Sequence, residues 1–269
     1  MADAKTNLSQ GLFFYFAAFT ILLILFSTAT YFRNIIWKTD LALWMDVVKK
    51  SQNKERGHNE AGAAYHHLGL LDEAVKEYLT ALRLNPSFAG PYNNLGNIYS
   101  SQGKFDEAIN EYLTALRFNP DFAEAHNNLG NIYSNLGQFD EAIKEYLIVL
   151  RLNPSFAEAH SNLGNAYLNK GQINDAIQEY LTALRLKPDY AEVYYNLGNV
   201  YLNQGRLDEA IKEYMTALEL NPNDIDVHYN LGIAYLRKGL KYDAKNEFRI
   251  TLKLKPNFAK AKKIIESLE

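Results

Sequence analysis

Along most of this chain, apolar and polar residues follow the spacing of amphipathic helices. The stretch "AIQEYLTAL", residues 176–184, is representative, because its apolar residues recur at intervals of three and four and so share one face of a helix. Gly and Pro residues interrupt the pattern at regular points, where helices are expected to end. The pattern therefore predicts an all-helical chain of short helices.

The interruptions recur with a fixed period of 34 residues. Prolines mark it at Pro86, Pro120, Pro154, Pro188, Pro222 and Pro256. A small residue of the expected first helix keeps the same phase at Gly62, Gly96, Gly130, Gly164, Gly198 and Gly232, and an aromatic ring of the expected second helix does so at Tyr78, Tyr112, Tyr146, Tyr180, Tyr214 and Phe248. Small residues let two antiparallel helices approach closely while the ring fills the gap between them.

The ends of the helices carry their own signals. Each expected first helix is followed by a glycine, as at Gly137, where a left-handed C-cap costs little. An Asp or Asn then stands where an N-cap would open the second helix, at Asp72, Asp106, Asp140, Asn174 and Asp208. The last unit has Tyr242 in this place, which predicts a less regular start for its second helix.

These positions and the 34-residue spacing resemble the tetratricopeptide repeat (TPR). The resemblance implies an all-α TPR superhelical solenoid of six helix pairs in residues 55–258, divided as 55–88, 89–122, 123–156, 157–190, 191–224 and 225–258. Stacked pairs share a continuous core that one pair alone cannot form, and the two ends need caps. Residues 33–54 are expected to supply a junction and an N-terminal capping half repeat, and residues 259–269 a C-terminal capping helix.

The N-terminus differs from the rest, because residues 12–32 contain no charged side chain. A helix of that length spans about 31 Å, close to the thickness of a bilayer core, which predicts a single transmembrane helix after an N-terminal tail of residues 1–11. A cleaved signal peptide, with Ser27–Ala29 as a small-residue cleavage site, and a buried soluble helix remain the alternatives.

In TPR proteins the first helices line a concave groove, so a residue type repeated in them forms a row. Asparagine does so here, at Asn94, Asn128, Asn162, Asn196 and Asn230 and, three residues later, at Asn97, Asn131, Asn165 and Asn199. Side-chain amides both donate and accept, which suits them to hold the backbone of an extended peptide. The rows resemble the asparagine-lined superhelix of O-linked N-acetylglucosamine transferases, although a merely solvated surface remains the alternative.

Charge refines the expected peptide-binding groove. An acidic edge is formed by Glu124, Glu158, Glu192 and Asp226, and aromatic surface is added by Tyr195 and Tyr229. Some TPR proteins clamp acidic tails with basic groove residues, which are missing at the matching positions here. An extended neutral or basic segment of a partner protein is therefore the expected ligand, unless the acidic row is only a solvated helix face.

The search for other chemistry finds little. A net charge of −3 and the lack of a basic run argue against nucleic acid, and the absence of cysteine removes thiolate chemistry. His126, His160 and His228 occupy a position that is Tyr in two other repeats, which indicates packing in place of metal ligation. The chain is thus expected to have no catalytic site, no metal and no cofactor.

The sequence therefore predicts a membrane-anchored scaffold that binds partner proteins, as an assembly or stabilising subunit of a membrane or envelope complex. Helices of membrane proteins around the anchor are expected as further partners. The segment after the apolar run, residues 33–56, also resembles the junction in polytopic glycosyltransferase-like membrane proteins that end in TPRs, so an accessory role in such a system is the alternative. That resemblance favours repeats on the extracytoplasmic side, whereas the basic residues Arg33, Lys38, Lys49 and Lys50 favour the cytoplasmic side.

Overall fold

The computed structural model describes residues 23, 26 and 39–268. The predicted N-terminal tail, and the predicted transmembrane helix apart from Leu23 and Phe26, lie outside the described residues. Among the residues that are described, no helix combines the length and the apolar character that crossing a membrane requires.

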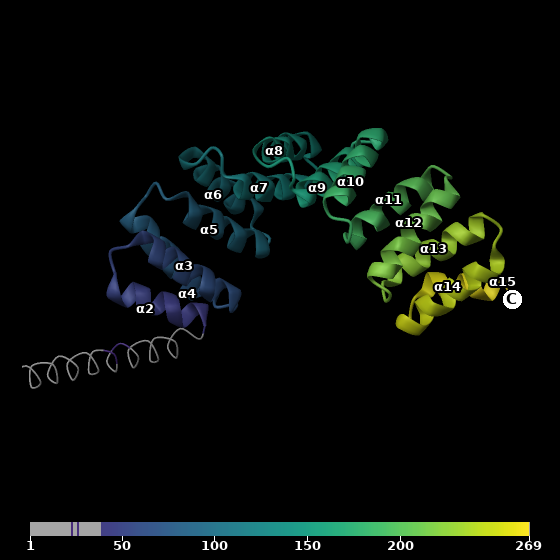
Figure 1. Cartoon of the computed structure of the whole chain (residues 1–269), viewed down its shortest axis with the longest axis horizontal. Helices are drawn as coiled ribbons and strands as arrows, with labels where there is room; N and C mark the ends of the chain where they lie inside the picture. The colour runs from purple at the N-terminus through teal and green to yellow at the C-terminus, as the bar shows by residue number, and fades with distance from the viewer. Residues whose placement is uncertain (1–22, 24–25, 27–38, 269) are drawn as a thin grey trace, which may run out of the picture. The chain divides into compact units, whose positions relative to one another are not determined.

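The described residues form fourteen helices and no strand, which confirms the expected all-helical repeat fold (Figure 1). The helices are α2 (Asp40–Lys50), α3 (Glu55–His67), α4 (Leu71–Leu84), α5 (Ala89–Ser101), α6 (Phe105–Phe118), α7 (Ala123–Asn135), α8 (Phe139–Leu152), α9 (Ala157–Asn169), α10 (Ile173–Leu186), α11 (Ala191–Asn203), α12 (Leu207–Leu220), α13 (Ile225–Arg237), α14 (Lys241–Leu254) and α15 (Ala259–Leu268). Contacts divide the chain into two compact units, Met1–Phe118 and Asn119–Glu269.

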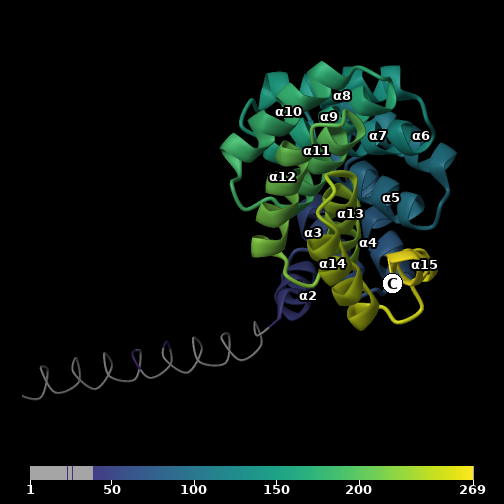
Figure 2. The same cartoon turned by 90° about the vertical axis from the view of Figure 1, so that its right-hand side faces the viewer.

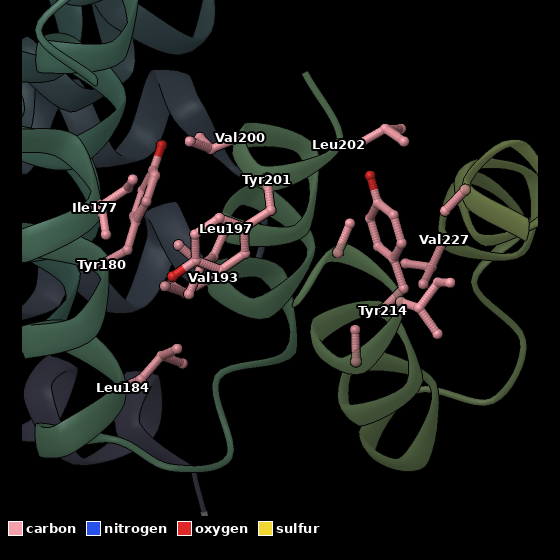
Figure 3. Close-up of a cluster of buried hydrophobic side chains, with 14 of the residues drawn as sticks. Ile177, Tyr180, Leu184, Val193, Leu197, Val200, Tyr201, Leu202, Tyr214 and Val227 are labelled. Carbon is pink, nitrogen blue, oxygen red and sulfur yellow. The ribbon is translucent and has the colours of Figure 1, made fainter. Parts of the chain in front are cut away.

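Each unit is a stack of helix pairs with its own core. In the first unit, α3 pairs with α4 and α5 with α6, and Tyr78 of α4 is buried with Leu95 and Ile98 of α5. In the second unit the pairs are α7 with α8, α9 with α10, α11 with α12, and α13 with α14. Its largest cluster joins Tyr180 of α10 to Leu197 of α11 and Tyr214 of α12 (Figure 3). In both units, rings of the second helices are thus buried together with apolar residues of the first helix that follows.

The small residue of each first helix is required by the ring of the second helix. A Cβ placed on Gly164 would lie 2.7 Å from Cε1 of Tyr180, and the other five repeats give 2.6–2.8 Å at the equivalent ring carbon. Real side chains essentially never approach so closely, so an alanine here would force the two helices apart. The in-phase Gly and aromatic residues are thus two halves of one contact.

The predicted helix ends are half right. Gly137 follows α7 with φ +73°, and the equivalent glycine of every repeat has positive φ, as the left-handed C-cap requires. The predicted N-caps are wrong, since α8 begins at Phe139 after a cap residue Gln138 with no side-chain cap bond, and Asp140 lies inside the first turn. An acidic residue there is stabilised by the helix dipole without capping.

Shorter helices lie at the two ends of the described chain. α2 begins after Thr39, whose side chain accepts a hydrogen bond from the backbone N–H of Ala42, and it packs against α3 in the first unit. In the second unit α15 packs against α14, and Ile264 and Ile265 cover the cluster that contains Phe248. Figure 2 shows α14 beside α13 in this unit.

Candidate functional site

The two rows of asparagines lie on the first helices α5, α7, α9, α11 and α13, and all nine side chains are half-buried. In the second unit they are joined to one another by hydrogen bonds. Asn165 Oδ1 accepts from the hydroxyl of Tyr180 at 2.6 Å and from Nδ2 of Asn196, one repeat later, at 3.3 Å. The amides therefore do not act as separate groups.

The same arrangement recurs on either side. Asn131 Oδ1 accepts from Tyr146 at 2.7 Å and from Asn162 Nδ2 at 3.1 Å. Asn199 Oδ1 accepts from Tyr214 at 2.7 Å and from Asn230 Nδ2 at 2.9 Å. We call this set the asparagine relay; it consists of Asn131, Asn162, Asn165, Asn196, Asn199 and Asn230 with Tyr146, Tyr180 and Tyr214.

In the first unit the pattern is only partly kept. Tyr112 donates to Asn97 Oδ1 at 2.7 Å, but Asn94 Nδ2 donates to Asn59 Oδ1 at 3.1 Å. Ala63 stands at the place in the first repeat where the next four repeats have the relay acceptor.

The relay borders a polar hollow of about 350 Å³ in the second unit. Its lining residues are Asn131, Ser134, Asn135, Tyr146, Glu158, Asn162 and Asn165. Four of the predicted groove residues, Asn131, Asn162, Asn165 and Glu158, are therefore brought together around one space. The hollow is large enough for several ligand atoms, and all of its lining residues are polar.

The hydrogen bonds of the relay determine which donors and acceptors in the hollow remain free for a ligand. The Oδ1 atoms of Asn131 and Asn165 each accept two protein hydrogen bonds, which uses the capacity of a carbonyl oxygen. Within the described residues their Nδ2 groups meet no protein acceptor, and Asn162 uses one of its two N–H groups. Among these three amides, the N–H groups that meet no protein acceptor therefore outnumber the oxygens that accept no hydrogen bond, which suits the amides to the carbonyl oxygens of an extended backbone.

The acidic edge is exposed to solvent. Glu124, Glu158, Glu192 and Asp226 all lie on the surface, on the first turns of their helices. Burial raises the pKa of Tyr146 and Tyr180, and the nearby carboxylates of Glu158 and Glu192 raise it further, so these hydroxyls stay protonated donors. The carboxylates thus lie close to the relay and give it a negative surrounding.

The two predicted groove tyrosines are used mainly in packing. Tyr195 lies 6.2 Å from the ring of Tyr214 and its hydroxyl accepts from Asn230 Nδ2 at 3.3 Å. Tyr229 lies between Phe248 and Phe258, at 5.8 and 5.0 Å. Both rings are half-buried, so only part of each remains for a ligand.

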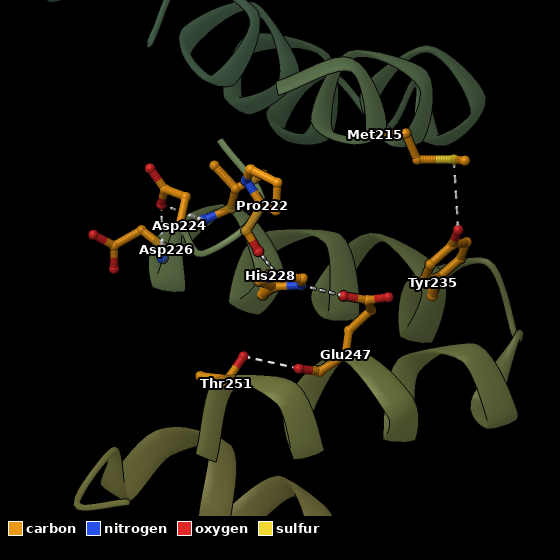
Figure 4. A network of polar contacts seen from close by, with 9 residues as sticks. Met215, Pro222, Asp224, Asp226, His228, Tyr235, Glu247 and Thr251 are labelled. Carbon is orange, nitrogen blue, oxygen red and sulfur yellow. Dashed lines mark hydrogen bonds and ion pairs between the residues drawn. The ribbon is translucent and has the colours of Figure 1, made fainter. Parts of the chain in front are cut away.

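The histidines form a contact that the sequence reasoning missed. His228 Nδ1 lies 2.6 Å from Glu247 Oε2 and its Nε2 lies 3.0 Å from the carbonyl oxygen of Pro222, as Figure 4 shows. Equivalent pairs join His58 to Glu77, His126 to Glu145 and His160 to Glu179. A Glu 19 residues after each His was the available signal.

These histidine clasps, as we call the four His–Glu pairs, fasten the first helix to the second and to the preceding turn. Two acceptors face the ring, and both ring nitrogens can donate to them only when the ring is charged. For His126, burial acts against the charge, but the hydrogen bonds to Glu145 and to the carbonyl of Pro120 outweigh it and raise the pKa. In the described residues no group of three His, Cys, Asp or Glu side chains is placed to hold a metal ion.

Three comparisons with known proteins place this geometry in context. A family model described as TPR repeat matches residues 62–103, 96–137, 130–171, 164–205 and 198–239. A comparison with curated proteins found no match.

Several solved structures resemble the chain. The crystal structure of MamA protein is 31% identical over 65% of this chain and 96% of its own, with a TM-score of 0.58. YrrB, described as a TPR protein with an unusual peptide-binding site, is 25% identical over 70% of this chain and 97% of its own, with a TM-score of 0.59. PilF of Pseudomonas aeruginosa, at 18% identity, 79% and 97% coverage and a TM-score of 0.71, shows the fold alone.

Proposed function

This chain belongs to the tetratricopeptide repeat family, and we propose that it is a scaffold that binds an extended segment of a partner protein along the asparagine relay. The observation that carries the proposal is the polar hollow lined by Asn131, Asn162 and Asn165. Repeats of this family typically act as non-catalytic scaffolds, and a related protein, YrrB, is described as having a peptide-binding site.

The chemistry of the relay defines the ligand. Its N–H groups that meet no protein acceptor match the carbonyl oxygens of an extended chain, and every peptide has these oxygens whatever its side chains are. Glu158 at the rim favours a neutral or basic segment over an acidic one, because an acidic segment would meet like charge. We propose such a segment as the partner.

The test uses full-length protein in detergent and peptides selected against it from a random displayed library. Asn162→Ala with Asn196→Ala should weaken binding of the selected peptides about 5- to 150-fold, since each lost hydrogen bond contributes about 0.5–1.5 kcal/mol. Lys144→Ala with Gln178→Ala, at exposed positions of the second helices α8 and α10, is the matched control and should leave binding unchanged. Equal affinity of the relay variant and the wild type would overturn the proposal.

Glu158→Lys tests the charge of the ligand separately. For selected peptides that carry basic residues, the substitution should weaken binding and reduce its dependence on salt. A peptide set dominated by acidic sequences, or unaffected by the reversal, would contradict the proposed basic or neutral partner.

We further propose that residues 12–32 anchor the scaffold in a membrane as a single-pass protein, where it stabilises a membrane or envelope complex. The support is the uncharged run itself. Full-length protein should remain in the membrane fraction after alkaline extraction, whereas recovery in the soluble fraction would contradict the anchor.

Placement of the repeats on the extracytoplasmic side rests on the junction of residues 33–56, as does the alternative role in a glycosyltransferase-like system. Protease added to sealed, right-side-out vesicles should then cleave the repeats. Protection of the repeats would place them in the cytoplasm instead.

A further inference from the structure

The first repeat differs from the relay repeats in the hydrogen bonding of one buried tyrosine hydroxyl. Tyr78 is fully buried, and within the described part of the chain no group accepts its hydroxyl. The equivalent Tyr146, Tyr180 and Tyr214 each donate to an asparagine. That asparagine is Ala63 in the first repeat, which brings no acceptor to the same place.

A second position near Tyr78 also has a smaller side chain than its equivalent at the hollow. Glu158 of α9 lines the hollow beside Tyr146, whereas the equivalent residue near Tyr78 is Gly90 of α5. A Cβ on Gly90 would lie 3.6 Å from Asn59 Oδ1, which places Gly90 beside the amides of the first unit. Two oxygen-bearing side chains of the hollow are thus replaced at the equivalent place by Ala63 of the first repeat and Gly90 of the second.

The remaining groups of the first two repeats define what could fill this place. Asn94 and Asn97 are kept, and His66 and His67 replace Ser134 and Asn135 at the rim. Glu60 Oε1 accepts a long hydrogen bond of 3.4 Å from Asn59 Nδ2. Its carboxylate lies close enough to add to the effect of burial on the pKa of Tyr78, which is raised. Glu60 also lies three residues before Ala63 on α3, so both residues share one face of that helix.

We propose that the surface at Ala63 is a subsite for a primary carboxamide, the side chain of an Asn or Gln in the bound segment. Its carbonyl oxygen accepts from Tyr78, as Asn131 Oδ1 does from Tyr146, and its NH₂ group donates to Glu60. A carboxylate would be repelled by Glu60, and an apolar side chain would leave the Tyr78 hydroxyl unpaired. The inference rests on the proposed function, because a bound segment carries the amide into the groove.

The chain has no cysteine, so a single introduced thiol can deliver test groups to the subsite without a partner. His67→Cys in full-length protein replaces an exposed residue whose equivalent, Asn135, lines the hollow. The protein is equilibrated with 2-mercaptoethanol and with disulfides of matched thiols ending in a carboxamide, a carboxylate or an isopropyl group, each with two to four methylene groups. Labelling is read by intact mass spectrometry.

The carboxamide should label at least about fivefold more at equilibrium than either matched thiol, the ratio expected for one added hydrogen bond. Tyr78→Phe and, separately, Ala63→Asn in the His67→Cys background should remove this preference, with circular dichroism confirming the fold. Asn135→Cys is the matched control, because Asn131 already accepts the hydrogen bond of the equivalent Tyr146 there. This variant should show no preference for the carboxamide. Equal labelling by the three thiols, or a preference that survives Tyr78→Phe, would overturn the subsite. Because the thiol delivers the amide, this outcome does not depend on whether the relay binds a peptide.

Discussion

The first and the last repeat have both lost the hydrogen bond that joins tyrosine to asparagine in the repeats between them, but they have lost it in different ways. In the last repeat, Phe248 replaces the tyrosine and Ile233 the asparagine, and both belong to one apolar cluster. In the first repeat, Ala63 replaces the asparagine while Tyr78 keeps its hydroxyl without an acceptor.

The difference shows that losing both partners of a buried hydrogen bond costs less stability than losing only the acceptor. Replacing both partners by apolar groups of similar shape is nearly neutral, whereas a donor left alone keeps the full desolvation penalty, about 1–3 kcal/mol. The last repeat is therefore a completed apolar end of the stack. The first repeat keeps a buried hydroxyl that no described protein group accepts, and the proposed carboxamide subsite would give this hydroxyl a partner.

The largest expected effect comes from introducing into the last repeat a buried tyrosine hydroxyl without an acceptor, as in the first repeat. Phe248→Tyr buries a hydroxyl beside Ile233 with no acceptor, and the free energy of unfolding should fall by about 1–3 kcal/mol. Adding Ile233→Asn supplies the acceptor and should recover most of the loss. Urea denaturation followed by circular dichroism measures both, and a double variant no more stable than the single one would contradict this account.

The opposite change should relieve the first repeat. Tyr78→Phe removes the unpaired hydroxyl and should raise the free energy of unfolding by about 1 kcal/mol. The matched Tyr146→Phe breaks a made bond and should lower it by about 0.5–1.5 kcal/mol. The sign of the change separates the two repeats, and a loss of stability in both variants would mean that Tyr78 has an acceptor after all.

A smaller gain is expected when the first repeat receives the missing acceptor. Ala63→Asn gives Tyr78 a partner, and the gain of about 0.5–1.5 kcal/mol is reduced by the poorer helix propensity of Asn, about 0.7 kcal/mol. The gain should vanish in a Tyr78→Phe background. A gain of the same size in both backgrounds would show that a hydrogen bond from the Tyr78 hydroxyl to the introduced amide was not the cause.

The smallest expected effect concerns the histidine clasp of His126. The neighbouring repeat has Tyr92 at the same position, so the two repeats can be compared directly. The pKa of His126 is raised in the folded state, so its clasp stabilises the fold below the ordinary His pKa of about 6.5 and loses this contribution as the pH rises through the folded value. His126→Tyr, which copies Tyr92 and its bond to the carbonyl of Pro86, should flatten this decline. Melting temperatures of both proteins between about pH 6 and pH 8 measure it, and parallel profiles would contradict the clasp's role.

Much of the fold could be predicted from the sequence because the repeats have the same types of residue at the positions where their two helices make contact. The pairing of Gly164 with Tyr180 fixes the approach of two helices, and periodicity repeats it in phase. The N-caps failed because Asp140 is favoured in a first turn by the dipole as well as at a cap, and composition does not distinguish the two places.

The candidate site was harder to predict. Periodicity showed that Asn131 and Asn162 lie in the two neighbouring rows of asparagines, but it does not say that one donates to the other or that Tyr146 takes the remaining acceptor site. The same limit hid the partners of the histidines, since Glu145 lies on the second helix. Binding by the groove residues and the anchor of residues 12–32 stay predictions.

The relay has a polarity. In every link the amide of the later repeat donates and that of the earlier repeat accepts, from Asn230 to Asn199, from Asn196 to Asn165 and from Asn162 to Asn131. The side-chain dipoles are therefore aligned along the row, and its two directions are chemically unequal. A strand of peptide also has a direction, since its N–H and C=O groups alternate from N- to C-terminus. If a segment binds along the relay as proposed, the repeats are expected to distinguish its sequence from the reversed copy, and one end of the segment should point toward the N-terminal repeats.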